Sequence, residues 1–317
     1  MAHVPHHPDC IPHIPFDQYK ERYSRVLSLE RTENGILTAK MQYQGGSVMW
    51  GNVIHRAINQ LMVDIGQDEE TEIVIFGGSG KNFVAQSSEL DIDHEVRKQN
   101  WFLFEQNWID GCRNCESIVG LEVPTIGVIN GPGYHTEMAL MCDITLIADD
   151  ANICDPHFYC GFVPGDGIQI AFRNAMGIKR ANYAMFTGQI ITPQQALEYG
   201  MVNEIVPKDQ IYERAMEIAR EIMKKDRITR RLTASILRNP WREALARELR
   251  NGFCVEMFNS KSAYASHASG GWRDITTRCG AEWIEQDKDY HLGPNPDGSG
   301  CHELQPEDYQ ASGQFNG

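Results

Sequence analysis

The 317-residue sequence lacks any apolar run close to the ~20 residues that a membrane-spanning helix needs. Its first ten residues, Met-Ala-His-Val-Pro-His-His-Pro-Asp-Cys, lack the basic region and the apolar stretch of a secretory signal peptide. We therefore expect a cytoplasmic protein that has no membrane partner.

Positive charge is also scarce. Lys and Arg number 29 against 43 Asp and Glu, which gives a formal net charge of −14 at pH 7. This balance disfavours non-specific binding to polyanionic surfaces, so we expect no nucleic-acid partner. Apolar residues make up 42% of the chain, which is enough to build a substantial core.

Metal and disulfide patterns are weak. The nine cysteines are odd in number and scattered, which is typical of free thiols in a reducing compartment. Cys112 and Cys115 have C-x-x-C spacing, but they sit in a helical pattern without a second Cys or His pair at metal spacing. Packing as small apolar residues is favoured over a redox or zinc role. We expect no metal and no cofactor.

The first residues are rich in histidine, which suggests either a metal site or an unstructured arm. Interleaved prolines and the terminal position favour the arm. The histidines concerned are His3, His6, His7 and His13.

Four segments are expected: an arm at 1–24, a core at 25–207, a helical region at 208–267 and a tail at 268–317. The tail is rich in Gly, Asp, Ser and Pro with little periodicity, so it is predicted to wrap a surface or to be partly disordered. Strands are predicted over 26–31, 36–42, 73–76, 124–130, 143–148 and 202–206. Helices are predicted over 51–65, 95–119, 137–142, 168–176, 179–187, 193–199, 209–225, 228–238 and 241–266. The alternation of strand and helix indicates an α/β class.

Three loops follow predicted strands, where α/β proteins gather ligands. The loop at 77–86 lacks the residue order of a phosphate-binding loop and is better suited to offer N–H groups to an oxyanion. The loop at 130–137 delivers His135 and Glu137 to the start of a helix. In the loop at 155–167, His157 and Asp166 lie among glycines, and a carboxylate beside an imidazole can orient a general base.

Each of these residues also has a structural interpretation. His157 can be an ordinary loop histidine, and Asp166 between glycines can form a turn or cap the next helix. Glu137 can stabilise a helix N-terminus, His55 can be half-buried at a surface, and Trp50 can belong to the core. The individual residues leave both interpretations open.

Taken together, several motifs resemble the crotonase (enoyl-CoA hydratase/isomerase) superfamily. They are Ile129-Asn-Gly131, Glu137-Met-Ala-Leu-Met-Cys-Asp143, Gly161-Phe-Val-Pro-Gly-Asp-Gly167, Thr187-Gly-Gln189-x-Ile191-Thr192 and Tyr199-Gly-Met-Val-Asn-Glu-Ile-Val-Pro207. The match covers roughly residues 25–265 in consistent order. It implies an α/β crotonase-type spiral of ββα units with a C-terminal helical trimerisation region. A homotrimer or a dimer of trimers is the implied assembly.

The sequence departs from the acyl-CoA members of that superfamily in three places. The segment Pro132–Thr136 lacks the glycine triplet that helps to bind the thioester oxygen. His157 stands where hydratases carry their second catalytic glutamate. The segment Gln44–Met49 has none of the basic residues that usually meet the nucleotide end of CoA.

With these departures the chain resembles the branch of β-diketone hydrolases typified by 6-oxocamphor hydrolase. The matching features are Ser47-Val-Met-Trp50 with His55, His135-x-Glu137, Asp155-Pro-His-Phe158, Val163-Pro-Gly-Asp-Gly167 and Glu256. The resemblance implies a set of catalytic residues: His157, Asp166, His135, His55 and Glu256. The residues expected to contact the substrate are Trp50, Phe83, Ala85, Glu137 and Phe158.

The implied activity is retro-Claisen hydrolysis of a carbon–carbon bond in a cyclic or bicyclic β-diketone, which gives a keto acid. His157, oriented by Asp166, would take a proton from water, while His135 and Trp50 donate hydrogen bonds to the diketone oxygens. Such a base predicts that kcat/KM falls as His157 becomes protonated, between about pH 8 and pH 5. Two alternatives remain, an acyl-CoA hydratase or isomerase and a non-catalytic crotonase-like scaffold.

Overall fold

The computed structural model describes residues 12–87, 101–267, 271–283, 292–294 and 301–303. For residues 86–87, 101–104, 261–267, 271, 292–294 and 301–303 it describes the backbone only. His3, His6 and His7, the first residues of the helix predicted at 95–119 and most of the predicted tail lie outside the described residues.

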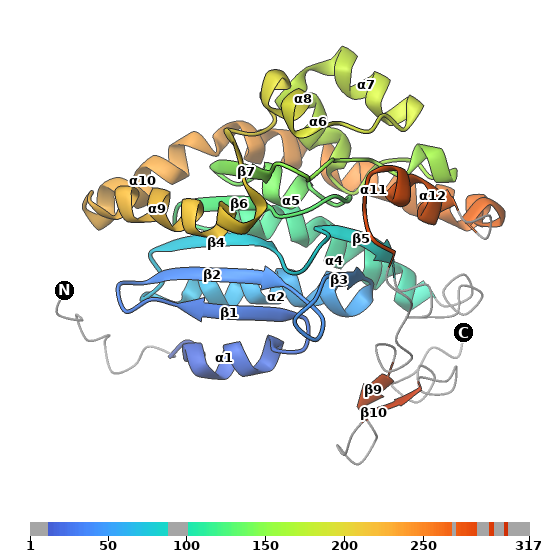
Figure 1. Ribbon diagram of the computed structural model, residues 1–317. Helices are drawn as coiled ribbons and strands as arrows, with labels where there is room; N and C mark the ends of the chain where they lie inside the picture. The colour runs from blue at the N-terminus through green and yellow to red at the C-terminus, as the bar shows by residue number, and fades with distance from the viewer. Residues whose placement is uncertain (1–11, 88–100, 268–270, 284–291, 295–300, 304–317) are drawn as a thin grey trace.

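A six-stranded mixed sheet forms the centre of the molecule (Figure 1). In spatial order its strands are β1 (Leu27–Arg31), β2 (Ile36–Met41), β4 (Ile73–Gly78), β6 (Thr125–Ile129), β7 (Ile144–Ala148) and β8 (Glu204–Val206). β1 and β2 form an antiparallel hairpin around Gly35, whose φ is +90°. The other neighbours are parallel. β4 and β6 are buried at every position, as expected for strands covered on both faces.

Helices pack around this sheet. α2 (Asn52–Gln67) packs on α4 (Trp101–Gly120), which also contacts α11 (Asn239–His267). The buried residues Ile54, Ile58, Leu61 and Ile65 recur at helical spacing along α2, which explains why the helix was predicted. α9 (Ile211–Met223) packs on β4, β6 and β7. None of the described helices is long and apolar enough to cross a membrane.

The remaining helices of the core also lie close to their predicted positions. They are α5 (Glu137–Leu140), α6 (Ile168–Met176), α7 (Ile178–Thr187), α8 (Pro193–Tyr199) and α10 (Arg227–Leu237). α8 shows how local sequence fixes a boundary. Thr192 and Gln195 exchange side chain-to-backbone hydrogen bonds in a capping box, and Gly200 ends the helix in a left-handed conformation.

Several regular elements lie where the sequence predicted none. α1 (Phe16–Tyr23) occupies part of the predicted arm, and its buried Tyr19 and Tyr23 donate hydrogen bonds to Asp68 and Asp64. β3 (Val48–Trp50) pairs in parallel with β5 (Val84–Ser87). The predicted tail contains α12 (Gly271–Arg278), β9 (Leu292–Pro294) and β10 (Cys301–Glu303). η1 (Phe158–Cys160) and η2 (Lys208–Gln210) are single 3₁₀ turns.

The sheet topology determines where chemistry can occur. β4, β6 and β7 are parallel neighbours, so the loops that follow them leave from the same edge of the sheet. These loops contain two of the segments singled out from the sequence, at 77–86 and 130–137. The loop after β7 leads to His157. The fold therefore brings distant segments of sequence together at one edge.

Candidate active site

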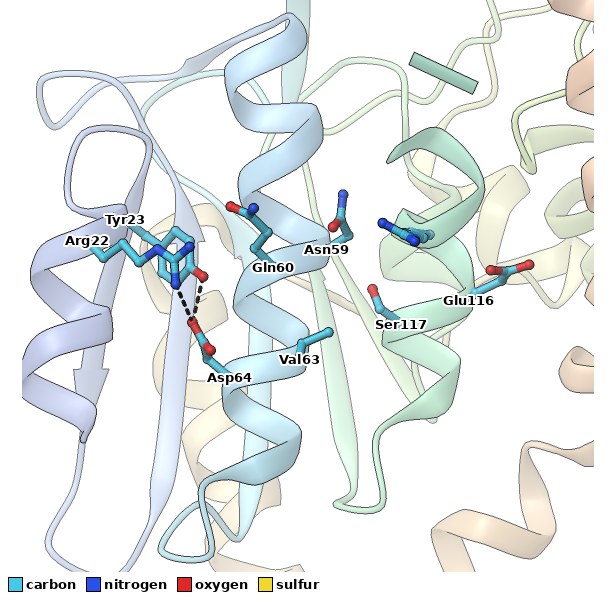
Figure 2. Close-up of a pocket in the computed structure, with 9 residues that line it drawn as sticks. Arg22, Tyr23, Asn59, Gln60, Val63, Asp64, Glu116 and Ser117 are labelled. Atoms are coloured by element: carbon cyan, nitrogen blue, oxygen red, sulfur yellow. Dashed lines mark hydrogen bonds and ion pairs between the residues drawn. The ribbon is translucent and has the colours of Figure 1, made fainter. Parts of the chain in front are cut away.

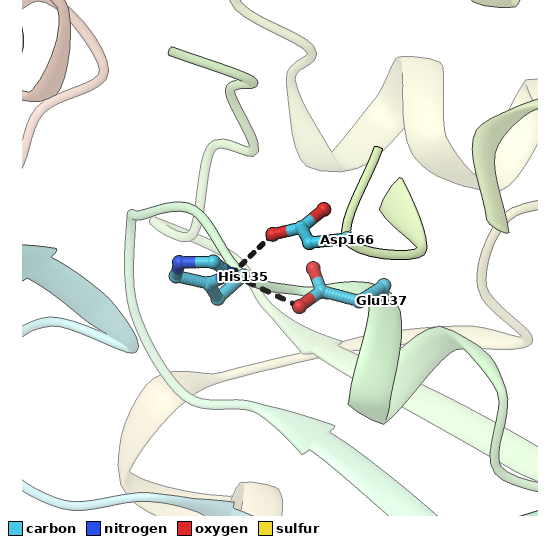
Figure 3. A group of neighbouring side chains, drawn as sticks. All are labelled: His135, Glu137 and Asp166. Carbon is cyan, nitrogen blue, oxygen red and sulfur yellow. Dashed lines mark hydrogen bonds and ion pairs between the residues drawn. The ribbon is translucent and has the colours of Figure 1, made fainter. Parts of the chain in front are cut away.

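His135 lies at the end of the loop that follows β6, directly before α5. Its φ is +54°, a left-handed conformation that is uncommon for residues other than glycine and that concentrates at functional sites. Nδ1 of its buried ring lies 3.0 Å from Oε1 of Glu137 and 3.2 Å from Oδ2 of Asp166. Figure 3 shows both carboxylates on the same side of the imidazole.

The flanking glycines place Asp166 in this cluster. A Cβ on Gly165 would lie 2.2 Å from the carbonyl oxygen of Gly252 in α11, so the loop can approach that helix only without a side chain. Gly167 has a φ of +124°, which a residue with a side chain rarely adopts. The N–H of Ile168 donates to Oδ1 of Asp166 at 3.2 Å. Asp166 therefore both forms the turn and faces the histidines.

His157 is the second buried imidazole, and carboxylates face both of its nitrogens. Nδ1 lies 2.7 Å from Oδ1 of Asp155, within hydrogen-bonding distance. Nε2 lies 3.7 Å from Oδ2 of Asp166 and 3.7 Å from Oε1 of Glu256, and both separations are longer than a hydrogen bond. We had expected Asp166 to orient His157. Instead Asp155 holds the ring, and Asp166 lies on the side of Nε2.

Glu256 reaches the site from α11. Its Oε2 accepts a hydrogen bond from the N–H of Gly165 at 2.9 Å, which leaves Oε1 directed at His157. The same helix therefore supports the loop around Asp166 and supplies a carboxylate. The site combines groups from β-strand loops and from the C-terminal helices, which are far apart in the sequence.

Aromatic rings pack against the imidazoles. Trp50 stacks on His135 with ring centroids 4.0 Å apart and an interplanar angle of 26°. His55 meets the same indole edge to face at 5.3 Å, so it adjoins the cluster through Trp50. On another side, Trp272 of α12 lies 6.0 Å from the ring of His157.

The other expected substrate contacts are placed differently. Phe158 is 49% exposed and packs against Phe186 at 5.0 Å, so the structure does not bring its ring into the cluster. Phe83 and Ala85 are buried near β5, where the N–H of Phe83 donates to the carbonyl of Pro132. The structure places these two residues beside the loop that carries His135.

Sequence reasoning missed two residues at the site. Asp155 precedes His157 by two positions, and this spacing was the available signal. Asp166 also lies in the loop of His157, so the sequence alone does not distinguish the two aspartates as partners of its Nδ1. Trp272 lies in the predicted tail, where no periodic pattern indicated a packed element.

Buried charges shift the pKa values of the two histidines upward. Burial alone would lower the pKa of His157, but the negative charges of Asp166, Asp155 and Glu256 outweigh it. They hold that pKa well above the usual 6.5. Burial also opposes the charged form of His135, yet Glu137 and Asp166 raise its pKa to about 9.

The carboxylates shift in opposite directions. Burial raises the pKa of Glu256 to about 8, with a further contribution from the charge of Asp166, and burial also raises the pKa of Glu137. Burial would raise the pKa of Asp166 as well, but His157 and His135 outweigh it and hold that pKa below its usual range. Titratable groups whose pKa values are pushed apart are typical of acid–base sites.

These shifts correct the expected pH dependence. A histidine whose pKa is raised stays protonated to higher pH, so the neutral base form of His157 accumulates at higher pH than it would in an ordinary histidine. The predicted fall of kcat/KM on acidification keeps the same direction. The midpoint of that fall lies above the ordinary histidine value of about 6.5.

The cluster can also hold a cation. Ligand atoms of His135, Glu137 and Asp166 lie within 4.8 Å of one another, as do those of His157, Asp166 and Glu256. Imidazole nitrogen and carboxylate oxygen are ligands that divalent metals accept. The contacts of 3.0 and 3.2 Å around His135 are equally within the usual range of N–H···O hydrogen bonds.

A surface pocket of about 480 Å³ lies elsewhere, between α1, α2 and α4 (Figure 2). Its lining residues are Arg22, Tyr23, Asn59, Gln60, Val63, Asp64, Arg113, Glu116 and Ser117. None of them belongs to the cluster around His157. We place the candidate active site at the cluster, because chemistry requires the converging titratable groups and not volume alone.

Comparison with known proteins identifies the family of the chain. The model of the enoyl-CoA hydratase/isomerase family matches residues 52–270, which is more than half of the chain. The chain belongs to this family. This match confirms the crotonase superfamily that the sequence predicted. The mixed sheet and the C-terminal helices confirm the predicted α/β fold class.

Solved members of the family are similar over most of this chain. A β-diketone hydrolase from the cyanobacterium Anabaena sp. PCC 7120, bound to (S)-3-oxocyclohexyl acetic acid, is 28% identical. It has a TM-score of 0.72 and covers 78% of this chain and 98% of its own. An enoyl-CoA hydratase/isomerase from Mycobacterium paratuberculosis has a TM-score of 0.67 at 20% identity, a likeness in fold alone.

Curated relatives in the family include acyl-CoA enzymes. The short-chain-enoyl-CoA hydratase of Clostridium acetobutylicum is 30% identical over 53% of this chain and 64% of its own length. The fatty acid oxidation complex subunit alpha of Shewanella frigidimarina is 28% identical over 62% of this chain. The match spans 28% of that longer relative.

Proposed function

We propose that this crotonase-superfamily enzyme hydrolyses a carbon–carbon bond of a cyclic or bicyclic β-diketone, giving a keto acid. The observation that carries the proposal is the environment of His157. Its Nδ1 is held by Asp155 at 2.7 Å, while its Nε2 faces Asp166 and Glu256 at 3.7 Å without a hydrogen bond to either. The similarity to a β-diketone hydrolase over 98% of that chain supports the same reaction.

The reaction begins when neutral His157 takes a proton from water through Nε2. The water oxygen then forms a bond to one carbonyl carbon of the diketone, and that carbonyl oxygen becomes an oxyanion. His135 donates a hydrogen bond to the developing charge from Nε2, because its Nδ1 is engaged by Glu137 and Asp166. Its raised pKa favours the doubly protonated ring that this requires. Loss of one such donor typically costs about 3–4 kcal/mol of transition-state stabilisation.

Collapse of the tetrahedral intermediate breaks the bond between the attacked carbonyl carbon and the carbon that lies between the two carbonyl groups. The electron pair moves into an enolate, which the second carbonyl stabilises. The imidazolium of His157 returns its proton to the enolate carbon, and the other product group is a carboxylic acid. The net change adds the elements of one water across the carbon–carbon bond. No electron acceptor is needed.

The backbone N–H groups after the Asn130-Gly131 motif argue against the acyl-CoA alternative. Crotonase-type acyl-CoA enzymes bind a thioester oxygen through N–H groups that follow the Asn-Gly motif. Here the N–H of Gly133 donates to the carbonyl of Asn152 at 3.1 Å, and that of Tyr134 donates to the carbonyl of Val84 at 2.7 Å. Both donors already have protein partners, which supports a substrate bound by side chains instead.

A hydratase or isomerase acting on an acyl-CoA is the second candidate. The curated relatives favour it, and Glu137 supplies a buried carboxylate beside His135. A non-catalytic scaffold is the third. It would not require the shifted pKa values that surround His157.

The test measures turnover of bicyclic 1,3-diketones and of crotonyl-CoA by the wild-type protein and by two histidine variants. We expect diketone cleavage that falls by at least a thousandfold in His157→Ala, because the base is lost. His13→Ala is the matched control, since His13 lies outside the cluster and near Asp68. Turnover of crotonyl-CoA with inert diketones would refute the proposal, and inactivity toward both would favour the scaffold.

A further inference from the structure

The last described helix lies over the candidate active site of its own chain. We call residues 271–283 the cap segment; it contains α12 and follows the region matched by the family model, which ends at residue 270. α12 packs against β5, η1 and α11. Figure 1 shows α12 at the right of the molecule, near β5 and α11. This part of the tail predicted at 268–317 packs beside the site.

Hydrogen bonds attach the cap segment to three segments that surround the site. Asn82, after β4, donates to the carbonyl of Glu282 at 2.7 Å and accepts from its N–H at 3.0 Å. Asn152, after β7, donates to the carbonyl of Cys279 at 2.9 Å. These bonds involve backbone groups of the cap segment, so its path is fixed largely independently of its side chains.

A side-chain contact adds a third attachment, at η1. The hydroxyl of Tyr159 donates to Asp274 at 2.5 Å. Because His157 directly precedes η1, the attachment lies close in sequence to the proposed base. The cap segment therefore contacts the loops after β4 and β7 and the turn beside His157.

Trp272 is the residue of the cap segment that reaches His157. Its ring is buried and meets the imidazole at 6.0 Å with an interplanar angle of 77°. It also lies 5.2 Å from the ring of Tyr134 and 6.2 Å from the ring of Phe162. Tyr134 in turn lies 5.0 Å from His135, so apolar rings adjoin both imidazoles on this side.

We propose that Trp272 is a specificity-determining residue that bounds the substrate site beside His157. Its indole, with Phe162 and Tyr134, contacts the hydrocarbon ring of the diketone and limits the size of the ring that can bring a carbonyl to Nε2. The inference rests on the proposed diketone hydrolysis. Within that substrate class it favours compact alicyclic 1,3-diketones, whose apolar surface matches three aromatic rings.

The physical reason is the short distance that the reaction allows. The attacked carbonyl carbon must lie about 3–3.5 Å from the water that His157 activates. The rigid indole of Trp272 lies against the same imidazole. It therefore limits the size of the substrate ring that can still place its carbonyl carbon at this distance. A pocket wall of this kind discriminates by about 10–200-fold for each methylene that it excludes.

The experiment compares Trp272→Phe and Trp272→Ala with the wild-type enzyme on bicyclic 1,3-diketones that grow by one methyl or methylene at a time. We expect Trp272→Ala to raise kcat/KM for the largest member relative to the smallest by about tenfold or more. Trp272→Phe should show an intermediate change. The relaxation should appear mainly in KM for the large substrates, because the chemical groups stay in place.

Trp283→Ala is the matched control. Trp283 belongs to the same cap segment, but its ring lies 5.2 Å from the guanidinium of Arg273. We expect its size preference to equal that of the wild type. Circular dichroism of every variant checks the fold, and the smaller change Trp272→Phe decides the matter if Trp272→Ala fails to fold.

The outcomes separate this inference from the function on which it rests. If the wild-type enzyme cleaves diketones and both Trp272 variants keep its size preference within about twofold, the role of Trp272 is overturned. The proposed diketone hydrolysis would then still stand. A wild-type enzyme that cleaves no diketone would overturn the proposed function and this inference together. A preference altered equally in Trp283→Ala would indicate a loosened cap segment and refute a specific wall at Trp272.

Discussion

At the scale of single residues, the environment of His157 differs from that of an ordinary loop histidine because carboxylates face both ring nitrogens. Asp155 favours the tautomer that carries a proton on Nδ1, and this leaves Nε2 to exchange protons with water. Asp166 and Glu256 stabilise the imidazolium that forms after that exchange. In our proposal, orientation and stabilisation are therefore performed by different carboxylates.

This division predicts the effect of Asp155→Asn. The amide can no longer stabilise the positive ring through Nδ1, so we expect kcat to fall on the order of a hundredfold or more. Removing a negative charge should also lower the pKa of His157, so the pH profile should shift toward acid. Asp149→Asn is the control in the same loop, where the carboxylate accepts from the N–H of Lys208. Unchanged kcat and an unshifted profile in Asp155→Asn would contradict a positioning role.

The wild-type pH profile is a separate prediction. Because the pKa of His157 is raised, the base form of its ring accumulates at higher pH than in an ordinary histidine. We expect kcat/KM for a diketone to increase from about pH 6 toward pH 9, with a midpoint above the ordinary histidine value of about 6.5. Initial rates at low substrate concentration measure it. A plateau that is already reached at pH 6 would show that no such group must lose a proton.

The sequence predicted which residues form the candidate site, but not which carboxylate pairs with which histidine nitrogen. His135, His157, Asp166 and Glu256 came from motif resemblance, and the structure brings them together in one buried cluster. Which carboxylate meets which nitrogen depends on loop geometry at the scale of a few ångströms. The φ of +54° at His135 and of +124° at Gly167 set this geometry, and spacing along the sequence does not reveal either value.

At the scale of elements, the close approach of α4 and α11 supports the site. A Cβ on Gly111 of α4 would lie 2.0 Å from Cε1 of Phe253 in α11 and 2.9 Å from Cε1 of His55. Phe253 also meets the ring of His55 at 6.5 Å. A glycine in the middle of α4 therefore allows the helix that carries Glu256 to approach the helix that carries His55.

We predict that Gly111→Ala destabilises the protein despite the higher helix propensity of alanine. Propensity favours alanine by about 1 kcal/mol, but overpacking against Phe253 typically costs about 1–3 kcal/mol and a rigid ring can exceed that. Gly66→Ala on α2 is the control, because its Cβ would meet Leu121 at an ordinary 3.8 Å. Urea unfolding should give a lower free energy for Gly111→Ala and an equal or higher one for Gly66→Ala. Equal stability of the two variants would contradict the close approach.

The length of an element decided whether the sequence could predict it. α2 and α11 contain several turns, so their apolar residues repeat often enough to be recognised. β3 has three residues and β5 has four, which are too few to show a period. α12 has eight residues within a Gly- and Ser-rich segment, and its position depends on Asn82 and Asn152, which are distant in sequence.

At the scale of the whole molecule, α10 presents an apolar stripe on its outer face. Ile228, Leu232 and Ile236 are 69%, 60% and 67% exposed and recur every four residues, so they lie on one side of the helix. The opposite side packs inward through Ala234. An exposed apolar stripe of this kind is typical of a surface that contacts another protein.

We propose that this stripe contacts a second copy of the chain, in the trimer or dimer of trimers that the crotonase resemblance implies for the region 208–267. Burying three large aliphatic side chains in each copy would contribute about 1.5–3 kcal/mol per residue.

The wild-type protein should therefore have a solution mass of three or six times the 35.9 kDa of one chain. The double variant Leu232→Glu and Ile236→Glu should be smaller, because the interface would bury unpaired charges. Thr233→Glu, on the same helix but off the stripe, should keep the wild-type mass. Light scattering coupled to size-exclusion chromatography distinguishes these cases, and a monomeric wild type would exclude the assembly.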